Sequence, residues 1–395
     1  MNGHLELLTI KKGSTDTKSI FTFYMLALFT SHFYFLVYPY IVFVLTKGWG
    51  GNLYLYTDLE VNLEFFRGFL ISVFVLFSYL MSFLFIHKWW LTRLEKEINT
   101  NFCFTKRMAL ISLAISIMIY LPWLGVDRAE YKSSVGFWPG EILISTAMMF
   151  FLFAVRGGYK EKLISSFVFL IIILSIRERE YILFIVALFW FSIEKKRSKF
   201  LLALLGVMAI LFYKSIFNYI TGNASPTFLF DDVYHFMRFS AADARHALNL
   251  MQSYLLGEAP SYIDTSIYFP HWIQNLFGAN FESNSRMASE YYTENMTGTG
   301  FNHALELWLN FGPYLPIFCF ISTAGLALLA RLGPILIVPV LTFIIKAARG
   351  DLSALVVVWI ILPSLLLICL YVIDRFLLQN LTTTLNRFRG DKGEV

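Results

Sequence analysis

Residues 19–45 read SIFTFYMLALFTSHFYFLVYPYIVFVL, an apolar stretch with no Asp, Glu, Lys or Arg. About 20 apolar residues are enough for a helix to cross the hydrocarbon core of a bilayer. Three lysines, Lys11, Lys12 and Lys18, precede the stretch, and no small-residue cleavage site follows it. The stretch therefore predicts a retained first membrane span and not a cleaved signal peptide.

The same pattern recurs along the chain. Of the 395 residues, 57% are apolar and 15% are charged, against about 25% charged in an ordinary soluble domain. This composition excludes a soluble multi-domain enzyme and a disordered chain. It predicts an all-α polytopic membrane protein with about ten spans, and at most twelve, in the runs 19–45, 68–86, 108–124, 141–155, 163–176, 181–193, 200–216, 307–330, 333–345 and 352–373.

The distribution of cations predicts the orientation of these spans. With the N-terminus inside, 20 of the 32 Lys and Arg residues fall on the cytoplasmic side, as the positive-inside rule requires. Both termini are then cytoplasmic. The net charge of +5 reflects these membrane-facing loops and predicts no nucleic-acid partner, and three cysteines are too few for a disulfide framework.

The spans divide the chain into three parts. Residues 1–216 hold the first seven spans, residues 217–306 form one large outer loop, and residues 307–395 hold the last three spans and a cytoplasmic tail. The loop is rich in aromatic residues and has no Gly/Ser run, so it should be folded. It holds four of the seven histidines, namely His235, His246, His271 and His303.

Residues 232–256 of this loop predict an amphipathic helix on the membrane surface. Its apolar face would carry Val233, Phe236, Met237, Ala244, Leu248, Met251 and Leu255. Its opposite stripe contains Arg238 and Arg245. This stripe either binds an anionic ligand or is only the solvated face of the helix.

Charged residues between two apolar runs indicate a functional site more specifically than the surface helix does. Arg177-Glu178-Arg179-Glu180 separates two apolar runs of 14 and 13 residues, each reaching only about 20 Å as a helix. Ionisable groups at such depth are functional candidates, although the alternating signs could also neutralise one another. Lys346 and Arg349 add outer cations. Arginine suits phosphate because its planar fork donates paired hydrogen bonds.

Residues 300–313 read GFNHALELWLNFGP and end the loop. His303, Glu306 and Asn310 recur at helical spacing, so they should share one face at the top of the eighth span. A carboxylate one turn from an imidazole can orient it as a general base. The alternative is that these residues only cap and pack the entrance of the span.

This stretch resembles the signature of oligosaccharide repeat-unit polymerases, the Wzy family, and more loosely a segment of O-antigen ligases. Ser175 to Arg179 is similar to the family's arginine at the outer end of a mid-chain span. The motifs cover under a tenth of the chain, whereas the architecture agrees along its whole length. Tyr314-Leu315-Pro316 departs from the family pattern, which has a second glycine after Asn-Phe-Gly.

The resemblance implies a GT-C-like glycosyltransferase of the bacterial inner membrane, with its active site on the periplasmic side. Such an enzyme transfers a glycan from undecaprenyl pyrophosphate to the distal sugar hydroxyl of a lipid-linked repeat unit, with inversion and without a metal or other cofactor. It works with membrane lipids and a chain-length regulator protein. We expect His303 or Glu306 to take the hydroxyl proton, and the substrate pyrophosphate to be bound by arginines drawn from Arg177, Arg179, Arg238, Arg245, Arg286 and Arg349.

Three other functional classes remain compatible with the sequence. An O-antigen ligase would transfer the same donor to lipid A-core and would leave bare core when deleted. A metal-dependent glycosyltransferase would use paired acids such as Asp58 and Glu60 in the first outer loop and would lose activity in EDTA. A flippase or transporter of the lipid-linked sugar would more typically show repeated halves and broken helices, and no internal repeat is evident in this sequence.

Overall fold

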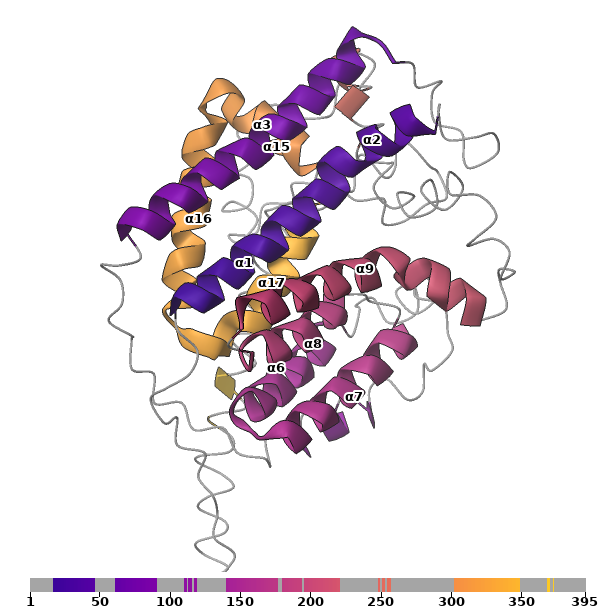
Figure 1. Cartoon of the computed structure of the whole chain (residues 1–395), viewed down its shortest axis with the longest axis vertical. Coiled ribbons are helices and arrows are strands. Elements are labelled where there is room, and N and C mark those ends of the chain that lie inside the picture. The colour runs from indigo at the N-terminus through magenta and orange to yellow at the C-terminus, as the bar shows by residue number, and fades with distance from the viewer. Residues whose placement is uncertain are drawn as a thin grey trace, which may run out of the picture.

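The computed structural model of this chain is built from helices throughout the part that it describes (Figure 1). Three of these helices are long and apolar enough to cross a membrane, namely Thr17–Leu45, Leu63–Trp90 and Gly312–Ala330. The apolar helices indicate a membrane protein, as the sequence predicts. The described residues are 17–46, 61–90, 140–176, 180–193, 195–220 and 302–348, with isolated residues within 110–118, 248–256 and 368–372.

The first span is one rod made of three segments. Helix α1 (Thr17–His32) passes through a π-helical turn (Phe33–Val37) into α2 (Tyr38–Leu45). Helix α3 (Leu63–Phe85) lies beside this rod and ends in a second π-helical turn, Ile86–Trp90. The side chain of Asn62 caps α3 by accepting a hydrogen bond from the Phe65 amide at 2.9 Å, which satisfies an amide that the helix leaves unpaired.

The C-terminal half adds a short helical hairpin. Helices α15 (His303–Phe311) and α16 (Leu315–Ala330) pack on each other and on α3. The rings of Phe311 and Phe318 stack across the turn at 4.7 Å. Helix α17 (Ile337–Ala347) follows and packs against α1. We call α1–α3, α15 and α16 the upper group, after their place in Figure 1.

Four helices form a second bundle below α1 in Figure 1, which we call the lower group. They are α6 (Gly140–Arg156), α7 (Tyr159–Ile176), α8 (Glu180–Trp190) and α9 (Lys196–Ile220). Each packs on the next in chain order, and α17 contacts both α6 and α8. Helix α17 therefore joins the two groups, and one apolar core cluster runs through both.

The surface of the upper group is apolar where it faces away from this core. In the best spanning window of each helix, 72% of α1–α2 is buried but only 33% of α3. The outer face of α3 exposes one large apolar side chain after another, which suits contact with lipid rather than water. These residues are Leu63, Phe66, Leu70, Val73, Phe74, Phe77, Leu80, Met81, Leu84 and Phe85.

One predicted boundary is wrong. The run 307–330 was expected to be one span, but the helix breaks at Gly312–Tyr314, where Gly312 adopts a φ of 49° and Pro313 follows. Proline has no amide to continue a helix, and glycine adopts positive φ at no steric cost.

Part of the predicted surface helix 232–256 lies within the described residues, and that part is helical. Leu248 and Met251 are buried, and Leu255 packs against the core. Leu248 lies with Tyr40 and Phe65, at the junction of α2 and α3. The apolar face predicted for this helix is thus confirmed at these three positions.

Candidate functional site

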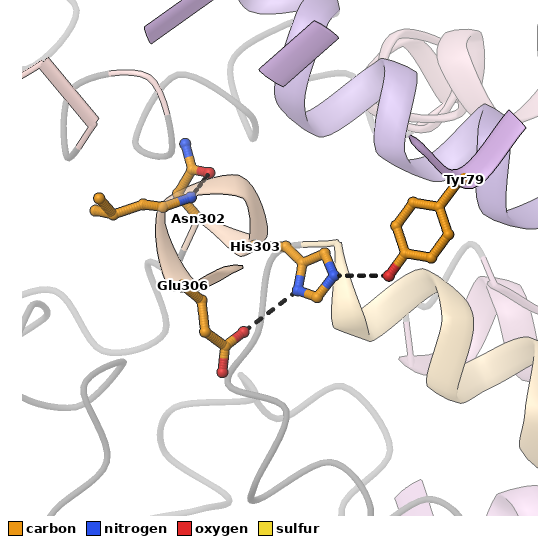
Figure 2. A network of polar contacts seen from close by, with 5 residues as sticks. Tyr79, Asn302, His303 and Glu306 are labelled. Carbon is orange, nitrogen blue, oxygen red and sulfur yellow. Dashed lines mark hydrogen bonds and ion pairs between the residues drawn. The ribbon is translucent and has the colours of Figure 1, made fainter. Parts of the chain in front are cut away.

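Four ionisable side chains from three helices meet inside the upper group. His32 ends α1, Tyr79 lies on α3, and His303 and Glu306 lie on the first turn of α15. Each is at most 3% exposed. We call these four residues the His–Tyr–Glu cluster, and Figure 2 shows three of them. Burying ionisable groups in an apolar core is costly unless they bond to one another.

The start of α15 orients two members of the cluster. The Asn302 side chain accepts a hydrogen bond from the Leu305 amide at 3.0 Å and so caps the helix. The capped turn places His303 and Glu306 on one face, three residues apart. Nδ1 of His303 then lies 3.3 Å from Oε2 of Glu306. The sequence predicted this shared face, and the structure confirms that the imidazole and the carboxylate meet.

The other nitrogen of His303 meets a phenol. Nε2 lies 3.2 Å from the hydroxyl oxygen of Tyr79 (Figure 2). A carboxylate only accepts hydrogen bonds, so the proton of a neutral His303 belongs on Nδ1. Nε2 then accepts the hydroxyl proton of Tyr79. The three groups form a chain in which Tyr79 donates to His303 and His303 donates to Glu306.

His32 packs against this chain without bonding to it. Its ring lies 5.0 Å from the His303 ring at 84°, and 5.4 Å from the Tyr79 ring at 70°. Nδ1 of His32 lies 2.9 Å from the carbonyl oxygen of Leu28, so that nitrogen carries the proton. Nε2 is then a bare acceptor, and it has no hydrogen-bond partner within the described residues.

The surroundings keep His303 neutral. Burial, followed by the neighbouring His32 ring, holds the pKa of His303 well below its ordinary value. At pH 7 the imidazole therefore carries no charge and retains a lone pair on Nε2. A neutral imidazole oriented by a carboxylate is the usual arrangement of a general base.

The cluster lies beside the middle of two long apolar helices. The sequence predicted that His303 enters the membrane at the top of a span. In the structure α15 is a separate short helix, and His303 lies against His32 and Tyr79, which are the 16th of 29 and the 17th of 28 residues of their spans. The cluster is therefore about 20 Å from either end of the first span. Ionisable groups within membrane-spanning helices are functional candidates.

The structure describes few of the other predicted site residues. Arg177, Arg179, Arg238, Arg245, Arg286 and Arg349 lie outside the described residues, as does the side chain of Asn310. Lys346, expected to form an outer cationic pair with Arg349, is buried in the last turn of α17. No group of three or more metal-ligating side chains occurs within the described residues.

Sequence reasoning missed His32 and Tyr79. His32 had a usable signal, because it is the one ionisable side chain other than tyrosine in the apolar run 19–45 and such groups are rare within spans. Tyr79 had none, because one tyrosine among many aromatics in an apolar helix has no distinguishing pattern. Comparisons with protein-family models, curated proteins and solved structures give no match to this chain.

Proposed function

We propose that the chain is a membrane glycosyltransferase that polymerises oligosaccharide repeat units carried on undecaprenyl pyrophosphate. The observation that carries this proposal is the contact of Glu306 with a buried, neutral His303 whose Nε2 accepts from a hydroxyl. A base of this kind suits the activation of a sugar hydroxyl, and the site residues include the motif that resembles the polymerase family.

The proposed reaction joins two lipid-linked glycans. The distal sugar hydroxyl of the acceptor attacks the anomeric carbon of the donor, the glycosyl–phosphate bond breaks, and undecaprenyl pyrophosphate leaves. Nε2 of His303 takes the hydroxyl proton, after the sugar hydroxyl replaces that of Tyr79 as its partner. Glu306 stabilises the imidazolium that forms. Because pyrophosphate is a good leaving group, the remaining task is to bind its charge.

Arginines are the proposed binding partners of the pyrophosphate. Arg177 and Arg179, together with Arg238 or Arg245, would bind the pyrophosphate, and Arg286 and Arg349 would contact the rest of the substrate. Paired guanidinium hydrogen bonds neutralise a departing pyrophosphate without a metal ion. The full proposal includes about ten spans in a GT-C-like bundle, cytoplasmic termini, a periplasmic site in the bacterial inner membrane, and a chain-length regulator as partner.

The test uses a strain that lacks the gene, complemented with variants at matched membrane levels. The unmodified chain should restore a ladder of polymer lengths, whereas Arg177→Ala and Arg238→Ala should not. A core capped with a single repeat unit in the deletion strain indicates a polymerase, and bare core indicates a ligase. Purified protein should keep its activity in EDTA. Normal ladders of polymer lengths from both arginine variants would contradict the proposed pyrophosphate site.

A second candidate, a transporter of the lipid-linked sugar, is favoured by one observation. The α15–α16 hairpin is broken at Gly312–Tyr314, and its first turn carries buried ionisable groups beside the middle of two spans. Discontinuous helices and buried His and Glu residues are common at transport sites. Accumulation of cytoplasm-facing lipid-linked repeat units in the deletion strain would favour this candidate over the polymerase.

A further inference from the structure

The beginnings of two helices from different groups lie side by side. Helix α1 begins at Thr17 in the upper group, and α9 begins at Lys196 in the lower group. Nζ of Lys199 on α9 donates a long hydrogen bond of 3.5 Å to Oγ of Ser19 on α1. The first turns of α1 and α9 therefore meet, at the same end of both helices in Figure 1.

Trp190, the last residue of α8, holds the ammonium of Lys199 in place. Nζ lies 5.3 Å from the centre of the indole ring, within reach of a cation–π attraction. The ring packs in turn against Phe23 of α1 at 5.4 Å. Trp190 is only 9% exposed, and its indole N–H has no hydrogen-bond partner within the described residues. This N–H can only donate, so a partner must supply an acceptor.

The charge at this end is positive. Residues 17–20 and 195–199 contain no carboxylate and five cations, namely Lys18, Lys195, Lys196, Arg197 and Lys199. Asp16 and Glu194 precede them, so a net positive charge remains. The first amides of a helix lack partners within it, and the helix dipole adds positive charge there. Two helix beginnings that meet among cations favour an anion, and above all a phosphate.

An apolar stripe begins on α9 directly after these cations. The side chains of Phe200, Leu201, Leu204, Leu205 and Met208 are all exposed. Their spacing of one, three and four residues places them along one side of the helix. A soluble anion would use the charges and leave this stripe bare. A molecule with a phosphate at one end and hydrocarbon chains at the other matches both features.

We propose that the meeting point of α1 and α9 binds an anionic phospholipid. The oxygens of its phosphate accept hydrogen bonds from the Lys199 ammonium and the Trp190 indole N–H, and its acyl chains lie along the exposed stripe of α9. The bound lipid contacts both helices and so ties the upper group to the lower group at this end. The site includes no group of the proposed reaction, so it does not depend on glycan transfer.

The direct test is native mass spectrometry of the full-length protein in detergent, titrated with phosphatidylglycerol. Binding should be saturable and tighter than that of phosphatidylcholine, whose headgroup has no net charge. Lys199→Ala should weaken phosphatidylglycerol binding about five-fold, the usual contribution of one cation at an anionic membrane surface. Lys199→Arg should bind like the unmodified chain because the charge remains. Trp190→Phe, which keeps a ring but removes the N–H, should weaken binding as well.

The matched control is Lys160→Ala in the first turn of α7. Lys160 is exposed, and exposed apolar side chains follow it at Leu163, Ile164 and Phe167. No hydroxyl or indole contact holds this lysine within the described residues, and Glu161 adjoins it in sequence. Phosphatidylglycerol binding should stay close to that of the unmodified chain. Equal losses in Lys160→Ala and Lys199→Ala would show attraction by net charge alone and would overturn the proposal.

Thermal stability gives a second readout. Phosphatidylglycerol should raise the Tm of the unmodified chain and raise that of Lys199→Ala less, because a ligand stabilises the folded state that binds it. Equal Tm values without lipid show that the variant is folded. Displacement of the bound lipid by millimolar inorganic phosphate, or equal affinity for phosphatidylglycerol and phosphatidylcholine, would contradict an anionic phospholipid site. A confirmed lipid site in a protein that makes no polymer would reject the polymerase alone.

Discussion

The upper and lower groups both pack around one apolar core, but they bury different kinds of polar side chain. In the lower group the described side chains include the buried hydroxyls of Thr146, Ser165 and Tyr181 but no buried histidine or carboxylate, and Ser165 donates to the Phe150 carbonyl at 2.9 Å. In the upper group, His32, His303 and Glu306 are buried and contact one another or a tyrosine.

The buried hydroxyls of the lower group can hold helices together, whereas the buried imidazoles and carboxylate of the upper group can also transfer protons. A hydroxyl bonded to a backbone carbonyl places no charge in the core and needs nothing further. An imidazole and a carboxylate buried together add little net stability, because desolvation offsets their attraction. A functional role therefore explains the buried His303 and Glu306 better than a contribution to stability does. Matched substitutions in the two groups, or within the upper group, test this difference.

The largest expected effect is on transfer activity. His303→Ala should lower the polymerisation rate about 10² to 10⁴-fold, the usual contribution of a general base. Two controls should stay close to the unmodified rate: His87→Ala, at a histidine of the second span that lies outside the cluster, and Ser165→Ala in the lower group. Initial rates with purified protein and lipid-linked repeat unit measure this. Equal losses in all three variants would mean that the cluster has no special role.

The next effect compares two glycines at close helix contacts. A Cβ at Gly68 would come within 2.6 Å of the Tyr40 hydroxyl, and a Cβ at Gly206 within 2.6 Å of a Val186 methyl. Gly68→Ala and Gly206→Ala should each destabilise by about 1–3 kcal/mol through overpacking.

Only Gly68→Ala should also slow transfer, because Tyr40 lies on the same interface as the cluster. Gly325→Ala is the control, since nothing lies within 4 Å of its Cβ position. Unfolding midpoints and initial rates separate the two effects. Loss of transfer in Gly206→Ala at an unchanged unfolding midpoint would reject the division between groups.

A smaller effect compares two helix caps of the same chemistry. Asn62 caps α3, and Asn302 caps α15. Either asparagine replaced by alanine should cost about 1 kcal/mol. Asn302→Ala should in addition reduce transfer, because the capped turn sets the contact of His303 with Glu306. If both variants kept the full rate, the cap would serve stability alone.

The smallest effect is on the pH dependence of stability. The folded state holds the pKa of His303 below its ordinary value, so below about pH 6.5 the unfolded chain binds a proton that the folded chain does not. Stability should then fall as pH falls through this range. His303→Gln should make Tm decrease less between pH 7.5 and pH 5 than it does in the unmodified protein. A steeper fall in the variant would contradict the assignment.

The sequence predicted the helical class and the contact of His303 with Glu306, because apolar runs and three-residue spacing depend only on local geometry. It did not predict the break at Gly312, because an Asn-Phe-Gly-Pro stretch within an apolar run is compatible with a span that starts earlier. Nor did it predict that His32 and Tyr79 would meet His303. Their contacts join residues far apart in sequence, and only the packing of α15 on α1 and α3 brings them together.

The central claim is that His303 and Glu306 act as one unit. A double-mutant cycle with His303→Ala, Glu306→Gln and the double variant tests it most directly, using initial polymerisation rates of purified protein. Residues that act as a unit are strongly non-additive. We expect the double variant to be no slower than His303→Ala alone. Losses that multiply, or single variants that keep the unmodified rate, would contradict it.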